Sequence, residues 1–383
     1  MDAETHVETE LAFGTHLSLD ALEERLASAA RVLSRAPDTP LHFNLADVIW
    51  SDIGSLLFLA CTLSCLKRRG VPVQLTLPEQ QGRWDEPDSV RKARDFLKRW
   101  RFDSALSEAV TDYREILPAH QEEYFSDDLP LKFYAPAILR TQGETQVLLS
   151  CRLVEITHMT GGPVGGRRVS EEKIRSYVNA FLSQLSLEDR FREAIRKALR
   201  FSDQACMRFG SNILQEALLN TFEHPEASMS MIAMARQQKH LVIAVADNGM
   251  TIPDTIRTAF EQDQTPFEPT LSAKEDLELL KLGVESHSLE QAERAFRRDY
   301  EATDYATKPG KTSKPHIPRP KRGFGLTYVK NDTLDFGGYC VFRAGAASVR
   351  YFRKRGQEMR SGRAVSSWPG NLVKIFLPLA EEA

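Results

Sequence analysis

Apolar and polar residues alternate with two different periods in the first third of the chain. Apolar residues three or four positions apart predict amphipathic helices, and short apolar runs bounded by turn residues predict strands. The expected elements are a helix around Leu22–Leu33, a strand at 41–45, a helix at 54–67, a strand at 71–77 and a basic helix at 91–102. Strands that alternate with helices indicate a small sheet covered by helices.

The rest of the chain continues this mixture after a polar, acidic stretch at 111–130, which predicts a linker. The expected elements are a β-rich segment at 131–156, two amphipathic helices within 170–200, and helices at 274–282 and 289–300. The following Pro- and Lys-rich segment, 306–322, cannot be helical because prolines occur at 309, 315, 318 and 320.

Three separated segments carry the candidate chemistry. Glu216, Asn220 and His224 recur at every fourth position, so a helix would align them on one stripe. The apolar run 241–246 predicts a strand that ends at Asp247 and continues into a loop. That loop contains Asn248, Gly249, Met250, Thr251, Ile252 and Pro253, and the third segment contains Lys321, Arg322, Gly323, Phe324 and Gly325 before an expected helix start at Leu326.

These residue types suit a nucleotide triphosphate and its magnesium ion. The amide oxygen of Asn220 is a hard, neutral ligand for Mg2+, which usually keeps waters and phosphate oxygens as its other ligands. Glu216 could orient or deprotonate a water or hydroxyl beside the terminal phosphate. Asp247 can accept a hydrogen bond from the exocyclic amine of adenine.

The glycine segment is suited to phosphate. Gly323 and Gly325 allow backbone N–H groups to approach phosphate oxygens, and the helix that starts at Leu326 adds a partial positive charge. Lys321 and Arg322 precede them and would attract the same group.

Each segment also has a simpler interpretation. A Glu and an Asn four residues apart usually mark a solvated helix face, and most Asp-Asn-Gly triplets are turns. Pro225 follows His224, so this histidine is expected to cap or pack the helix end rather than contact a ligand. The joint occurrence of the three segments favours the ligand site.

In order and chemistry, the three segments resemble the N, G1 and G2 boxes of the GHKL ATPase superfamily, which includes gyrase and histidine kinases. The resemblance spans about 170–379. It implies an α/β sandwich with a mixed sheet covered by helices, ATP and Mg2+ as ligands, cofactor contacts that include Gly249 and Thr251, and a mobile ATP lid at about 254–322. Two positions depart from the pattern: Thr251 replaces a second glycine, and Asn371 follows Gly370 where the family has a threonine.

The N-terminal segment 5–115 resembles a STAS domain, the fold of anti-sigma-factor antagonists, on the strand–helix–strand order around the Asp52–Gly54 motif. In that family a serine directly before the motif glycine is often phosphorylated. Here the position is Ile53, which has no hydroxyl, although Ser51 and Ser55 lie close by. We expect a STAS-like docking domain at 1–118, a linker and β-rich connector at 119–169, and a GHKL-type domain at 170–383.

Composition limits the function classes. The 383 residues carry a formal net charge of −3, which argues against a dedicated nucleic-acid binder, and no apolar run reaches the roughly 20 residues that span a bilayer. Cys61 and Cys65 lie in one apolar helix and are expected to be reduced core residues. We therefore expect a cytoplasmic protein without membrane contact.

Two hypotheses follow from the resemblance. The first is an ATP-dependent switch or slow ATPase, in which nucleotide binding reaches a protein partner through the STAS-like domain or the lid. The second is an anti-sigma-type serine kinase that acts on a separate STAS partner. A two-component histidine kinase is not expected, because no histidine lies between His158 and His224. The resemblance allows a homodimer without requiring one.

Overall fold

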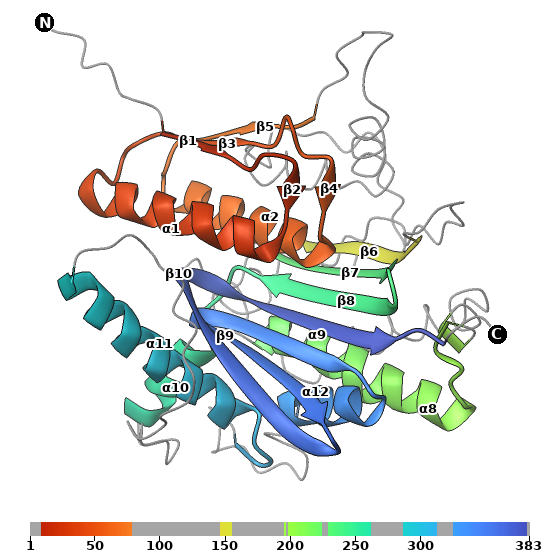
Figure 1. The fold of residues 1–383 in the computed structure, drawn as a ribbon. Coiled ribbons are helices and arrows are strands. Elements are labelled where there is room, and N and C mark those ends of the chain that lie inside the picture. The colour runs from red at the N-terminus through yellow and green to blue at the C-terminus, as the bar shows by residue number, and fades with distance from the viewer. Residues whose placement is uncertain are drawn as a thin grey trace, which may run out of the picture. The chain divides into compact units, whose positions relative to one another are not determined.

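A computed structural model describes residues 9–78, 146–154, 195–196, 198–223, 229–261, 286–311 and 325–380. The chain divides into two compact units, 1–121 and 122–383 (Figure 1), and both ranges contain buried apolar residues. Each combines helices with sheet, which confirms the α/β class. The helices expected at 91–102 and 274–282 lie outside the described residues, as does the linker at 111–130.

The first unit is built from strand–helix–strand repeats. Its parallel sheet has the order β1 (Thr9–Ala12), β3 (Leu41–Asn44), β5 (Val73–Thr76), and the connections are α1 (Leu19–Arg35) and α2 (Ile53–Arg68). A short parallel pair, β2 (His16–Leu17) and β4 (Trp50–Ser51), completes the unit. Parallel strands require such crossover connections, which the sequence pattern predicted. The strands before α1 were not anticipated.

Both helices start at side-chain caps and bury apolar residues. Ser18 accepts a hydrogen bond from the backbone N–H of Ala21, and Asp52 accepts one from that of Ser55. Helix α2 is buried along most of its length, which explains why its sequence is almost wholly apolar. Cys61 and Cys65 are buried free thiols there, as expected.

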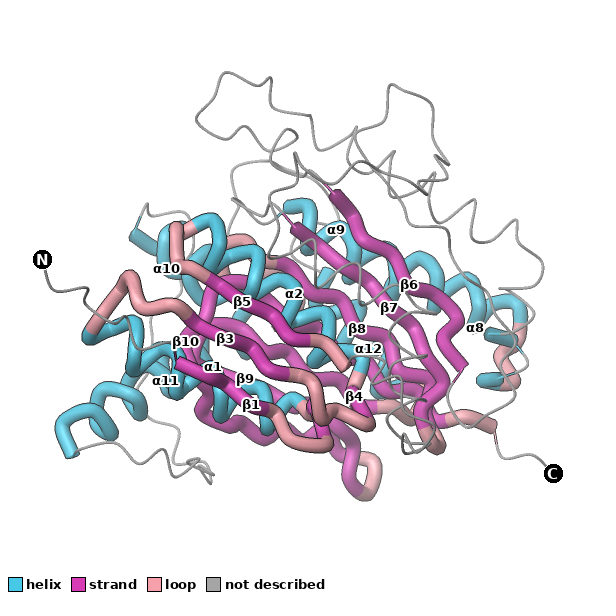
Figure 2. Tube along the Cα trace, turned by 90° about the horizontal axis from the view of Figure 1, so that it is seen from above, coloured by secondary structure: helices cyan, strands magenta, loops and turns pink. Residues whose placement is uncertain are grey.

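The second unit contains a five-stranded sheet (Figure 2). The strand order is β6 (Gln146–Val154), β7 (Met229–Gln237), β8 (His240–Asp247), β10 (Gln357–Pro378), β9 (Tyr339–Lys354). All neighbouring pairs are antiparallel, so the expected mixed sheet is wrong for the described strands. Tight connections join β7 to β8 and β9 to β10, and such connections produce antiparallel pairs.

Helices pack on one face of this sheet (Figure 1). In chain order they are α8 (Asp203–Arg208), the π-helix η1 (Phe209–Leu214), α9 (Gln215–Glu223), α10 (Ile252–Glu261), α11 (Ser286–Ala306) and α12 (Gly325–Asp335). The apolar core between them and the sheet includes Leu218, Ile243, Phe296, Val329 and Phe342. Helix α12 starts one residue before the expected Leu326.

Strand β9 bends at Gly345, which has a φ of +58°. The guanidinium of Arg350 lies 4.1 Å from the ring centroid of Tyr339, although eleven extended residues would span about 36 Å. The alternation of inward and outward side chains also shifts by one residue here: Phe342 and Tyr351 both face the core. The bend lets one strand belong to the central sheet and to a long terminal hairpin.

Helix α11 covers the predicted helix at 289–300 and extends beyond it at both ends. It is anchored by Asp299, which is 2% exposed and accepts hydrogen bonds from the N–H of Ala346 (2.8 Å) and from Arg257 (2.7 Å). A Cβ at Gly345 would lie 2.3 Å from the Asp299 carboxylate. These contacts attach α11 to the sheet and to α10. The mobile lid expected at about 254–322 stays a prediction.

None of the helices in the described ranges is long and apolar enough to cross a membrane.

Candidate functional site

Helices α9 and α12 meet at the residues predicted to bind nucleotide. A Cβ built on Gly325 would lie 2.8 Å from Oε2 of Glu216, 3.5 Å from Oδ1 of Asn220 and 3.7 Å from its Nδ2. The first turn of α12 therefore touches the carboxylate and the amide, although more than a hundred residues separate them in sequence. Only glycine at position 325 permits this approach without displacing Glu216.

Asn220 has an unsatisfied polar atom at this contact. Its Nδ2 is buried and has no hydrogen-bond partner among the described residues. Leaving such a group unpaired costs roughly 1–3 kcal/mol, so a buried amide is normally satisfied by protein, water or ligand. A half-turn about χ2 exchanges Nδ2 and Oδ1, so the same position can present an oxygen to a cation.

Asp247 lies at the end of β8, facing the helices as Val245 does, because alternate strand residues share a face. It is 2% exposed. One carboxylate oxygen accepts from the N–H of Gly249 (2.9 Å), and both accept from Nδ2 of Asn371 (3.1 and 3.2 Å). Burial raises the pKa of Asp247 from 3.8 to about 7, although the hydrogen bonds from Asn371 and Gly249 lower it.

Asn371 holds both the Asp247 carboxylate and the loop that follows β8. It lies on β10 directly opposite Asp247, donates to the carbonyl of Met250 (3.1 Å), and accepts from the N–H of Ile252 (2.9 Å). The sequence indicated that this residue could donate a hydrogen bond in place of the threonine found in the GHKL pattern that the chain resembles. The structure adds that Asn371 also caps the first residue of α10 from another strand.

The start of α10 was missed in the sequence analysis. Thr251 caps it, because its hydroxyl accepts from the N–H of Asp254 (3.2 Å) and also contacts the Asp254 carboxylate. The signal was present: a threonine followed two residues later by Pro253 and then by an acidic residue is typical of a helix N-terminus. The Thr251 hydroxyl therefore has a local structural role.

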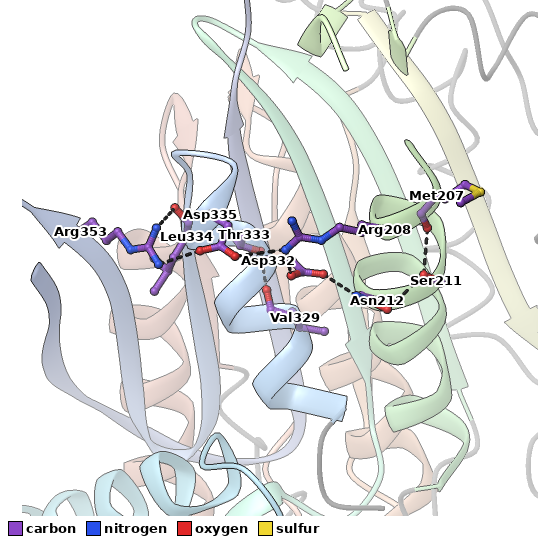
Figure 3. A network of polar contacts seen from close by, with 10 residues as sticks. All are labelled: Met207, Arg208, Ser211, Asn212, Val329, Asp332, Thr333, Leu334, Asp335 and Arg353. Carbon is purple, nitrogen blue, oxygen red and sulfur yellow. Dashed lines mark hydrogen bonds and ion pairs between the residues drawn. The ribbon is translucent and has the colours of Figure 1, made fainter. Parts of the chain in front are cut away.

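A polar network holds the other end of α12 against the helices before α9 (Figure 3). Asp332 is 5% exposed and accepts from Arg208 and from Nδ2 of Asn212 (2.6 Å). Asp335 joins Arg208 (3.1 Å) to Arg353 of β9 (2.7 Å).

The network and the site lie about two helical turns apart along α12. Seven residues separate Gly325 from Asp332, which is about 10 Å along a helix. Asn212 belongs to the π-helix η1, an uncommon geometry in which the helix is wider just before α9. The network thus fixes how the two antiparallel helices lie against each other, and no sequence motif indicated it.

Of the remaining site residues, one lies in a described helix. Leu326 is buried in the core at the start of α12. Lys321, Arg322, Gly323 and His224 lie outside the described residues. Within the described ranges there is no group of three or more His, Cys, Asp or Glu side chains that could hold a metal ion.

In the first unit, the residue at the position expected to correspond to a phospho-acceptor is buried and has no hydroxyl. Ile53 is the first residue of α2 and is fully buried. The nearby hydroxyl of Ser55 is also buried and donates to the Asp52 carboxylate (2.5 Å). Ser51 is half-buried in β4.

Comparisons with protein-family models, with curated proteins and with solved structures found no match for this chain.

Proposed function

We propose that the second unit binds ATP and Mg2+ as GHKL proteins do, and that the chain is a nucleotide-dependent switch or slow ATPase with a STAS-like docking domain in its first unit. The observation that carries the proposal is the close approach of Gly325 to Glu216 and Asn220. A helix N-terminus without a side chain suits a phosphate, and the neighbouring carboxylate and amide oxygens suit its cation.

Two features support the fit of these ligands. The buried, unpaired Nδ2 of Asn220 marks a polar position that the described protein does not satisfy. The carboxylate of Asp247 is buried and acts as a hydrogen-bond acceptor for Gly249 and Asn371. An adenine amine is a donor of the kind that such an acceptor binds.

In this proposal each residue has one task. Asn220 offers its amide oxygen to Mg2+, which neutralises phosphate charge when bound. Glu216 accepts a proton from a water beside the terminal phosphate. Asp247 orients the base, and Asn371 holds Asp247 and the following loop in place. The N–H groups at the start of α12 would donate hydrogen bonds to the phosphates.

Nucleotide binding would be transmitted through the fixed contacts of α12. Helix α12 touches the site at Gly325 and is joined to β9 through Asp335 and Arg353. A change at the first turn of α12 would therefore reach the terminal hairpin, because the helix is fixed to both. The STAS-like unit would then pass this change to a protein partner.

The serine kinase alternative is constrained by the first unit. Ile53 lacks a hydroxyl and the Ser55 hydroxyl is buried against Asp52, which favours an acceptor serine on another protein. Labelled ATP incubated with the chain and a STAS protein should then label that protein. Labelling of neither protein in the presence of measurable ATP turnover would favour the ATPase.

The test compares Glu216→Ala with Glu261→Ala, an exposed glutamate at the end of α10. Calorimetry should show Mg-ATP binding to both variants and to the wild type within about threefold. Phosphate release should fall by about 10²-fold or more in Glu216→Ala only, the usual effect of losing a positioned general base. Absence of binding heat for the wild type would reject the whole proposal, and binding without turnover would reject its enzymatic half.

A further inference from the structure

The terminal hairpin formed by β9 and β10 has two chemically different faces. Cross-strand partners share a face, and residues alternate between faces along each strand. The register pairs Lys354 with Gln357, Phe352 with Met359, and Arg350 with Ser361 on one face. Arg353 pairs with Glu358, and Tyr351 with Arg360, on the other. Tyr351 belongs to the core, so the second face is the inner face and the first is the outer face.

On the inner face, cations and carboxylates are paired. Arg353 binds Asp335 (2.7 Å), and Arg360 binds Asp304 of α11. Glu358, the single acidic residue of the hairpin segment 348–363, binds Lys330 of α12 (2.7 Å). These ion pairs attach the hairpin to the helices and leave little net charge on this side.

The outer face has cations and no carboxylate. It carries Arg350, Lys354 and Arg363, and Arg355 follows at the tip. Residues 353–361 are all exposed, and neither Lys354 nor Arg355 contacts an acidic group among the described residues. The segment 350–363 has six basic residues and one acidic residue in a chain whose net charge is −3. Its charge is therefore concentrated on one side of a projecting ribbon.

Two geometric features hold these cations in place. The guanidinium of Arg350 lies 4.1 Å from the ring centroid of Tyr339 and 5.5 Å from that of Phe352, so aromatic rings fix its orientation. Arg355 occupies the left-handed region, with φ +52°, beside Gly356 with φ +79°. Asparagine or glycine normally fills that turn position, because a larger side chain is strained there. The tip keeps an arginine at a cost in stability.

We propose that the outer face of this hairpin binds the phosphate backbone of a nucleic acid without reading its sequence. Arginine predominates among the outer cations, and the planar guanidinium fits phosphate oxygens. Gln357 and Ser361 on the same face are further donors of the kind that contact phosphates. A two-stranded ribbon also has the width that enters the major groove of duplex DNA. The net charge of the chain gave no indication of this surface, because the acidic residues lie elsewhere.

A membrane surface fits less well, because Met359 is the single large apolar residue of the tip region with substantial exposure, at 41%. Insertion into an interface relies on several such residues together with the cations. An acidic protein partner would satisfy the charge but would not need a narrow, regularly spaced ribbon. Nucleic acid satisfies both the charge and the shape.

The experiment measures binding of the full chain to fluorescent 20-residue oligonucleotides of arbitrary sequence, duplex and single-stranded, by anisotropy between 50 and 200 mM salt. Four phosphate contacts predict a slope of log K against log salt near −3.6 for duplex, or about 100-fold weaker binding across this range. The double variant Lys354→Gln, Arg355→Gln should halve that slope. A control with the same charge change, Arg25→Gln with Arg31→Gln on α1, should bind like the wild type.

Circular dichroism melting checks that the variants fold, and Arg350→Gln serves as a second outer-face variant if the tip variant melts early. The proposal is supported if the wild type binds either probe, the tip variant loses this binding and the control keeps it. The probe that binds more tightly shows whether the surface prefers duplex or single-stranded nucleic acid. The proposal is overturned if the wild type binds neither probe at 50 mM salt. Equal weakening by the α1 control, or binding to vesicles with anionic lipid but to neither oligonucleotide, overturns it as well.

Discussion

Replacing Asp247 by asparagine should stabilise the protein without ligand at high pH. Burial raises the pKa of this carboxyl from 3.8 to about 7, so the folded state holds its proton over a range in which the unfolded chain has lost it. Below pH 3.8 the group is protonated in both states and has no effect. Between pH 3.8 and 7 the free energy of unfolding falls as pH rises, and above pH 7 the full penalty is present.

The magnitude follows from the shift. About three pKa units correspond to about 4 kcal/mol at 1.36 kcal/mol per unit. An asparagine oxygen can still accept from Gly249 and Asn371, but its amide nitrogen would face the second contact of Asn371, which costs about 1 kcal/mol. We therefore expect Asp247→Asn to be more stable than the wild type by about 3 kcal/mol at pH 8, and less stable by up to about 1 kcal/mol at pH 4, where only the lost contact remains.

Urea unfolding at several pH values, followed by tryptophan fluorescence, measures this difference. A matched control is Asp203→Asn, whose side chain is 93% exposed and should show no such pH dependence. The same Asp247→Asn protein should bind Mg-ATP at least tenfold more weakly, because an amide replaces the acceptor proposed for the adenine amine. A variant that is less stable than the wild type by the same amount at every pH would refute the assignment of Asp247 as a buried, proton-holding acid.

Two glycines give further predictions. In Gly325→Ala the new Cβ displaces only the end of the flexible Glu216 side chain, so the melting temperature should stay equal or rise slightly. ATP turnover should fall tenfold or more. The control is Gly210→Ala, whose Cβ would meet nothing within 4 Å, and it should keep its turnover. In Gly370→Ala the Cβ would lie 2.0 Å from a backbone oxygen of β8 at a φ of +87°, so urea unfolding should show a loss of at least about 3 kcal/mol. Gly356→Ala at the exposed hairpin tip, with open space around it, should cost only about 1 kcal/mol. Similar losses at both positions would contradict the packing argument, and normal turnover in Gly325→Ala would contradict the role of Glu216.

The sequence by itself determined the local elements with strong periodicity. Helix α2 is apolar along its length and β8 is a continuous apolar run ending in an acidic turn, so their type and ends follow from burial and turn chemistry. The spacing of Glu216 and Asn220 placed both on one helix for the same reason. The bend of β9 was missed, since it depends on partners far along the chain, whereas the start of α10 had a local signal in Thr251 and Pro253 that was overlooked.

Tertiary structure decided which of these residues meet. The contact of Gly325 with Glu216 and Asn220 needs α12 to run antiparallel to α9, and the pairing of Asn371 with Asp247 needs β10 to lie beside β8 in one register. A one-residue slip of that register would turn Asn371 to the opposite face of the sheet. Likewise, the sequence shows the charges of the hairpin residues. Their division into a neutralised inner face and a cationic outer face depends on tertiary structure, because Asp304, Asp335 and Lys330 lie on one side of the folded hairpin.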